Sequence, residues 1–255
     1  MAELHVNNVS KAYRSRRMFA SNSTVIFNDL NITLKDASFV SVIGPSGCGK
    51  STLLNMAAGL EPITGGDILV GETRVRGPGL DRGIVFQQYA LFPWLNVIDN
   101  VSFGLKSLGM AKDERYEIAR RYLRMTGLAE HETYYPAHLS GGMRQRVGIC
   151  RALAIDPEVL LLDEPFGALD AFTRETMQNA LEEICSTARK TVMFITHDIR
   201  EAVFLSDRVV VLGRAPGGVV MDLPIDLERP RNRHDREFAE YEAMLEKEIR
   251  NQMPL

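Results

Sequence analysis

The sequence predicts an α/β fold in which short, buried strands alternate with helices. Three apolar runs support this prediction, because apolar runs bounded by loops are typical of strands buried on both faces. These runs are Ser38–Ile43, Val159–Leu162 and Thr191–Thr196. A glycine-rich stretch follows the first run, and the helix-forming residues Thr52–Ala58 follow that stretch. Strand, glycine loop and helix therefore succeed one another.

The composition allows one domain with a sizeable core. The chain has 255 residues, of which 45% are apolar, and a net charge of −3. This charge does not suggest a nucleic-acid partner. The three cysteines, Cys48, Cys150 and Cys185, have no metal-ligand spacing, and a reduced cytosolic setting is expected. The first residues show no signal-peptide pattern, and no apolar run approaches the roughly 18 residues that span a bilayer.

The N-terminal residues predict short strands at His5–Val9, Thr24–Phe27 and Leu30–Leu34, the last with alternating apolar residues. Tyr13 follows the first of these strands. From its position alone, an ordinary aromatic residue at a strand end is favoured over a ligand-binding one.

The glycine-rich stretch has the pattern G-x-x-x-x-G-K-S of a phosphate-binding loop. Its residues are Gly44, Pro45, Ser46, Gly47, Cys48, Gly49, Lys50 and Ser51, with Thr52 next. Glycines allow the backbone N–H groups to turn inward, and the helix that follows adds unpaired N–H groups and a positive dipole end. Lys50 can reach the β- and γ-phosphates, and the Ser51 hydroxyl can ligate Mg²⁺. Many kinds of NTPase use such a loop.

Two further strands and an aromatic segment follow. We expect strands at Asp67–Gly71 and Gly83–Gln87. The segment Leu91–Leu95 contains Pro93 and the only tryptophan, Trp94. The proline argues against a continuous helix here, and a surface position and a core position of Trp94 are equally open.

Residues 97–160 are predicted to be mostly helical, with Ile118, Tyr122 and Met125 on one face. Ser140 is a plausible N-cap of a helix that Gly141 and Gly142 open and that runs to about Ile155. The first turn of this helix is a second possible phosphate site, although Ser-Gly is a common helix start.

Polar residues follow two of the buried runs. Asp163 and Glu164 come after Val159–Leu162, at the strand end where open α/β sheets bind ligands. His197 comes after Thr191–Thr196 and is expected on the same edge as Lys50. A structural and a catalytic role of His197 remain equally open.

The C-terminal part predicts strands at Arg208–Leu212 and Val219–Met221, a linker between Pro224 and Pro230, and a terminal helix. An apolar stripe runs along this helix, formed by Phe238, Tyr241, Leu245 and Ile249. Packing of this stripe on its own domain is favoured over a partner site.

This order of motifs resembles the nucleotide-binding subunits of ATP-binding cassette (ABC) transporters, from near Val6 to about Arg231. Gly44–Ser51 matches their Walker A motif and Val159–Asp163 their Walker B motif. Leu139–Met143 matches the signature usually written L-S-G-G-Q, with Met143 in place of the glutamine. The backbone N–H groups of this signature can still donate to a phosphate, so little loss is expected.

The remaining motifs also match. Gln87 fits the Q-loop, Gly167–Asp170 the D-loop and Thr196–Asp198 the switch histidine. Val9–Tyr13 fits the adenine-stacking loop, and on this resemblance Tyr13 is a nucleotide contact. Three segments are most similar to importers of nitrate, sulfonates or taurine: Leu91–Val97, Leu139–Val147 and Leu223–Arg231.

The resemblance implies an α/β P-loop NTPase (RecA-like) core with an N-terminal antiparallel β subdomain and an inserted α-helical subdomain at about 90–158. The ATPase domain would cover residues 1–231, and residues 232–255 would form a C-terminal helical tail.

It also implies a head-to-tail dimer, with a second copy or a related cassette. Each ATP would contact residues of both subunits; this set is Tyr13, Gly44–Thr52, Gln87, Ser140, Gly141, Gly142, Met143 and Asp170. Mg²⁺ would be held by Ser51, Gln87 and Asp163. Glu164 would be the general base, Lys50 and His197 would act on the γ-phosphate, and Asp170 would link the two sites.

On this resemblance the chain is an ATPase that lies peripherally on the cytoplasmic face of the inner or plasma membrane and powers import of a small anion such as nitrate, a sulfonate or taurine. Its partners would be membrane-spanning permease subunits and, indirectly, an extracytoplasmic solute-binding protein. Leu91–Leu95 would help to form the groove for a permease helix. The alternatives are the ATPase of an exporter or lipoprotein-release system and a non-transport ABC ATPase of DNA repair or translation.

Overall fold

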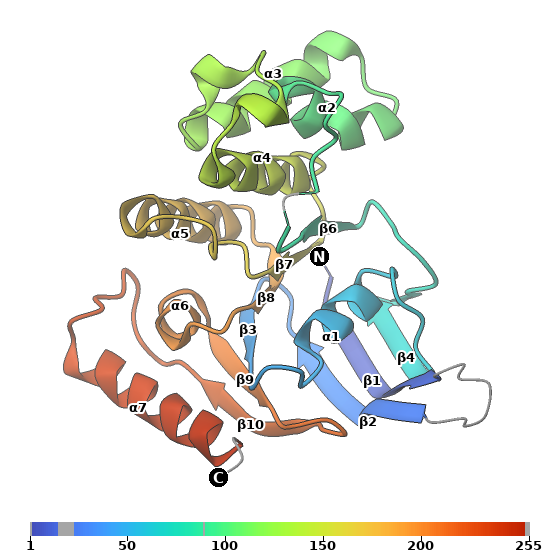
Figure 1. The fold of residues 1–255 in the computed structure, drawn as a ribbon, viewed down its shortest axis with the longest axis vertical. Helices are drawn as coiled ribbons and strands as arrows, with labels where there is room; N and C mark the ends of the chain where they lie inside the picture. Colours follow the sequence, from blue (N-terminus) through green and yellow to red (C-terminus); the bar gives the residue numbers. More distant parts are fainter. Residues whose placement is uncertain (1, 15–22, 89, 253–255) are drawn as a thin grey trace. The chain divides into compact units, whose positions relative to one another are not determined.

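The computed structural model describes residues 2–14, 23–88 and 90–252, and Figure 1 shows its ribbon. The chain forms two compact units. The terminal unit combines Met1–Gly79 with Arg189–Leu255, and the inserted unit is Leu80–Ala188. Within the described residues, no helix is long and apolar enough to cross a membrane.

An antiparallel sheet opens the terminal unit, as predicted. Its strands are β1 (Leu4–Arg14), β2 (Ser23–Leu34), β4 (Gly65–Val70) and β5 (Thr73–Arg74), in the order β2-β1-β4-β5. The expected pair of strands at 24–34 is one strand, β2. Asp29 has a φ of 62° there, and the β1–β2 register shifts between Leu30 and Phe27. A bulge therefore absorbs the polar residues that suggested a break.

The second group of strands in the terminal unit is mostly parallel. β3 (Phe39–Ile43) lies between β8 (Thr191–Ile195) and β9 (Arg208–Leu212) and is parallel to both, while β10 (Val219–Pro224) is antiparallel to β9. Every residue of β3 and β8 is buried, which explains why their sequences are mostly apolar. Because β3 and β8 are parallel, their carboxyl ends lie at the same edge of the sheet.

The described residues of the terminal unit also form three helices: α1 (Lys50–Ala57), α6 (Ile199–Leu205) and α7 (Arg236–Asn251). α6 has no signal in the sequence, because seven residues are too few to show helical periodicity. On α7, Phe238 and Leu245 are fully buried, and the helix packs against α6 and β9 (Figure 1). The favoured interpretation, packing on its own domain, is thus confirmed.

The inserted unit is mostly helical, as predicted for residues 97–160. Its elements are β6 (Arg82–Val85), α2 (Val97–Ser107), α3 (Lys112–Met125), short 3₁₀ turns at Ala129–His131 and Pro136–His138, α4 (Gly141–Ala154), β7 (Val159–Asp163) and α5 (Ala171–Thr187). β6 and β7 pair in parallel, and α2, α3 and α4 pack on one another.

The buried face of α3 differs from the predicted one. Ala119, Tyr122 and Leu123 are buried, whereas Met125 is 45% exposed. The buried stripe is therefore rotated around the helix relative to the apolar stripe of Ile118, Tyr122 and Met125, and only Tyr122 belongs to both.

Asn100 holds the segment 92–95 in place. Its side chain is fully buried in α2, accepts from the Phe92 N–H at 2.9 Å and donates to the Phe92 carbonyl at 3.1 Å and the Leu95 carbonyl at 2.9 Å. One amide thereby holds both ends of the segment 92–95.

Replacing Asn100 by leucine, which has a similar size, should lower the free energy of unfolding by about 2–4 kcal/mol, because buried backbone groups lose their partners. Urea unfolding measures this change, and Ser107→Ala at the exposed end of α2 is the control. A loss no larger than that of the control would show that Asn100 does not hold the segment.

Candidate nucleotide-binding site

The phosphate loop joins β3 to α1, as the sequence predicts. Gly47 and Gly49 have φ values of 78° and 103°. A Cβ on Gly49 would lie 2.6 Å from Ile26 and Phe27 side-chain atoms, whereas a Cβ on Gly47 would have nothing within 4 Å. The loop thus requires glycine at 49 for space as well as for conformation.

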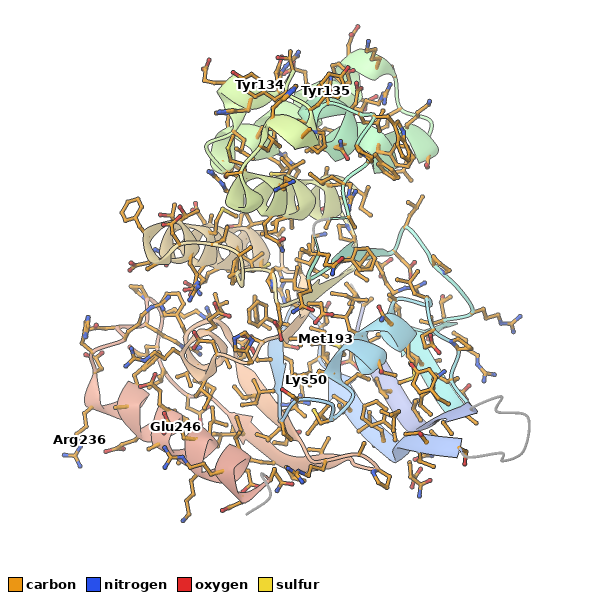
Figure 2. The ribbon with its side chains drawn as sticks, viewed as in Figure 1. Lys50, Tyr134, Tyr135, Met193, Arg236 and Glu246 are labelled. Atoms are coloured by element: carbon orange, nitrogen blue, oxygen red, sulfur yellow. The ribbon has the colours of Figure 1, made fainter. Side chains whose placement is uncertain are left out.

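Lys50 lies over this loop, and Figure 2 shows it next to the chain between β3 and α1. Its Nζ donates to the Gly44 carbonyl at 2.8 Å and to the Pro45 carbonyl at 3.1 Å, and it lies 3.8 Å from Cys48 Sγ. An ammonium group and the N-terminus of α1 therefore face one glycine loop. This combination fits an anionic phosphate.

Tyr13 lies beside the ion pair that buried Lys11 forms with half-buried Glu61. Its ring, 42% exposed, lies near the end of β1, and Lys11 Nζ sits 4.6 Å from the ring centre. Lys11 itself is 4% exposed and donates to Glu61 and to the Pro62 carbonyl. Because Glu61 is 50 residues away along the chain, the sequence analysis missed this contact. The cation orients an aromatic ring that still presents a large exposed area.

His197 follows β8 in a turn that side-chain hydrogen bonds stabilise. Thr196 Oγ1 donates to Glu201 Oε2 at 2.7 Å and accepts from the Asp198 N–H at 3.0 Å. Asp198 caps α6, and the His197 side chain is exposed. Since β8 and β3 are adjacent parallel strands, His197 and the Lys50 loop follow neighbouring carboxyl ends, as expected. The support that Thr196 and Glu201 give to this turn is not predictable from the sequence.

In the inserted unit, the carboxylate that follows β7, that of Glu164, lies beside the residue expected in the Q-loop. Asp163 is 8% exposed and ends β7. Glu164 has a φ of 46°, which is unusual for a residue with a side chain. Gln87 Nε2 donates to Glu164 Oε2 at 3.0 Å. The parallel pairing of β6 and β7 brings Gln87 and Glu164 together, and backbone strain at this point is typical of functional sites.

The segments expected as the signature and the D-loop also meet within the inserted unit. Ser140 caps α4 and accepts from the Met143 N–H at 3.2 Å. A Cβ on Gly142 would lie 3.0 Å from Leu169 Cδ2, so the first turn of α4 packs against the residue before Asp170. The Asp170 carboxylate caps α5. The hydrogen bond from the Thr173 N–H lowers the Asp170 pKa below its usual value, so the carboxylate is ionised at neutral pH.

Trp94 lies on the surface, with 71% of its area exposed, so the core alternative is wrong. Its ring packs 5.6 Å from that of Phe92, which in turn lies 4.4 Å from Phe103. Phe103 is 42% exposed. These three rings form an exposed aromatic cluster in the inserted unit.

Alanine at Gly49 should damage the loop more than alanine at Gly47. Both substitutions force a side chain into a positive-φ conformation, at about 1–2 kcal/mol. Only Gly49→Ala adds a clash with the β2 side chains, which costs a further 1–3 kcal/mol or so. Thermal unfolding and titration with a fluorescent ATP analogue measure both losses. Equal effects of the two substitutions would contradict this account of the loop.

Comparisons with known proteins agree with this geometry. A family model described as ABC transporter matches residues 27–167. An uncharacterized ABC transporter ATP-binding protein of Methanocaldococcus jannaschii is 50% identical over 239 residues, which is 94% of this chain and 88% of that protein. The taurine import ATP-binding protein TauB of Escherichia coli is 52% identical over 201 residues, which is 79% of each chain.

A solved structure shows the same fold. It is a dimeric ATP-binding cassette in a post-hydrolysis state, bound to ADP and Pi. It aligns with a TM-score of 0.79 and 32% identity over 88% of this chain and 100% of that one. The P-loop NTPase fold predicted from the sequence is thereby confirmed. The chain belongs to the ABC transporter family as one of its ATP-binding subunits, and the ATPase activity expected from its motifs is that of this family.

Proposed function

We propose that this chain hydrolyses ATP to power an importer of a small anion such as nitrate, a sulfonate or taurine. The observation that carries the ATPase part is the Lys50 ammonium held over the glycine loop at the N-terminus of α1. The importer part is supported by the similarity to TauB. That similarity also favours import over export and over a role in DNA repair or translation.

Two copies would share each ATP. In one copy, Lys50 and Ser51 hold the phosphates, and Tyr13 stacks on the adenine base. In the other copy, the first turn of α4, Ser140–Gly142, donates to the phosphates. The dimeric state of the solved cassette supports this arrangement. Asp170, packed next to the signature through Leu169, would link the two sites.

The oxygen donors of Ser51, Gln87 and Asp163 suit Mg²⁺, which prefers hydroxyl, carbonyl and carboxylate oxygens. When bound, Mg²⁺ neutralises charge on the phosphates. Glu164 accepts a proton from the attacking water, and the Gln87 amide orients its carboxylate. His197 donates to the γ-phosphate.

The partners follow from the same proposal. Permease subunits would dock on the exposed cluster of Phe92, Trp94 and Phe103, since an exposed aromatic surface suits a partner helix. The chain would then lie on the cytoplasmic face of the membrane, and the solute-binding protein would act indirectly. Co-purification of the tagged chain with a membrane-embedded protein from detergent-solubilised membranes tests this step, and its absence would contradict the transport role.

Glu164→Gln should lower steady-state ATP hydrolysis by about 100-fold or more, because the amide cannot accept the proton. The dissociation constant for ATP should stay within about twofold, since positioning of the nucleotide remains. Glu158→Gln is the matched control, because Glu158 lies just before the first residue of β7. It should change neither the hydrolysis rate nor the dissociation constant. Steady turnover by Glu164→Gln would remove Glu164 as the general base.

Lys11→Met should weaken ATP binding about threefold to tenfold, because the Tyr13 ring loses the cation that orients it. In a Tyr13→Ala background the same change should have no further effect on the dissociation constant. Thermal unfolding of the wild type, the two single variants and the double variant measures the stability that is lost when Glu61 has no partner. An equal loss of affinity with and without Tyr13 would show that Lys11 acts through stability alone.

A further inference from the structure

The C-terminal segment contacts the end of α6 through three arginines at alternating positions, Arg229, Arg231 and Arg233. Arg231 is only 8% exposed. Its Nη1 donates to three carbonyls at or just past the end of α6: those of Val203 at 2.7 Å, Phe204 at 3.2 Å and Ser206 at 2.6 Å.

These carbonyls are groups that a helix end leaves without intrahelical partners, and they carry the negative end of the helix dipole. A guanidinium group supplies both positive charge and several donors. The remaining donors of Arg231 bond the Ile225 carbonyl at 3.1 Å and the Leu227 carbonyl at 3.2 Å. One side chain therefore joins α6 to the linker that precedes α7.

The neighbouring arginines and α7 hold the rest of α6. Arg229 Nη2 donates to the Leu205 carbonyl at 2.7 Å, and the Arg233 guanidinium lies 3.9 Å from the centre of the Phe204 ring. At the other end of α6, Arg200 Nε bonds Glu242 Oε1 of α7 at 2.8 Å. A seven-residue helix is marginal by itself, so these contacts determine where α6 lies.

The position of α6 in turn determines the His197 turn. The residues on both sides of His197 bond the first turn of the helix: Thr196 through the Glu201 carboxylate, and Asp198 as the N-cap that accepts from the N–H groups of Arg200 and Glu201. A displacement of α6 must therefore move the backbone of His197.

We propose that the C-terminal segment, residues 225–251, positions His197 through α6, with Arg231 as the principal positioning residue. The segment is then part of the ATPase unit, and the expected division of the chain after residue 231 cuts through it. This inference rests on the proposed action of His197 on the γ-phosphate.

The test uses the full chain and the substitution Arg231→Lys, which keeps the charge but removes the planar set of donors. We expect kcat for ATP hydrolysis to fall about tenfold, as for a small misplacement of a group at the reacting centre. The dissociation constant for ATP should stay within about twofold. The His197 ring resonance, identified by its loss in His197→Gln, should shift in the NMR spectrum.

Arg236→Lys is the matched control, because Arg236 projects outward from the first turn of α7 (Figure 2) and its side chain is 92% exposed. It should change neither kcat nor the resonance. If Arg231→Lys does not fold, Glu242→Ala decides instead, with a kcat loss of about threefold and a shifted resonance. An unmoved His197 resonance, or an unchanged kcat alongside an inactive His197→Gln, would overturn the inference. An active His197→Gln would instead remove the proposed role of His197 itself.

Discussion

The parallel pairing of β3 with β8 and β9 is the constraint on which the terminal unit depends. Strands buried on both faces favour apolar side chains, so the charged and titratable side chains lie in the loops at their ends. The loop after β3 carries Lys50, and the turn after β8 carries His197. Polar contacts of β3 also stabilise the strand pairing. The Phe39 N–H donates to the Asp207 carboxylate at 2.8 Å, and the Ser41 hydroxyl bonds the Ser206 hydroxyl.

The features that sequence reasoning predicted depend on local chemistry. β3, β7 and β8 follow from short apolar runs, and the start of α4 follows from the capping residue Ser140. The features it missed depend on tertiary contacts. α6 is too short for a periodic pattern and is stabilised by arginines that lie 24 to 28 residues further along the chain. The exposed position of Met125 reflects how α3 packs, which its own periodicity does not contain.

The candidate site divides in the same way. Each motif was located from its own residues, and the family resemblance suggested a role for each. The contacts that orient these residues join distant positions: Lys11 reaches Glu61, and Gln87 reaches Glu164 across 77 residues. The positive φ of Glu164 could not be predicted from the sequence either, because glutamate has no preference for that conformation. What the sequence lacks is therefore the set of second contacts that hold the functional groups in place.

The Ser140 hydroxyl caps α4, and this cap is compatible with the phosphate contact proposed for the same residue. The Ser140 oxygen uses a lone pair to accept from the Met143 N–H, and a hydroxyl that accepts in this way keeps its own O–H as a donor. Capping therefore orients the hydroxyl and does not compete with donation to a phosphate. The cap involves the backbone of Met143, so the side chain at that position takes no part in it. This explains in physical terms why methionine in place of glutamine leaves the start of α4 intact.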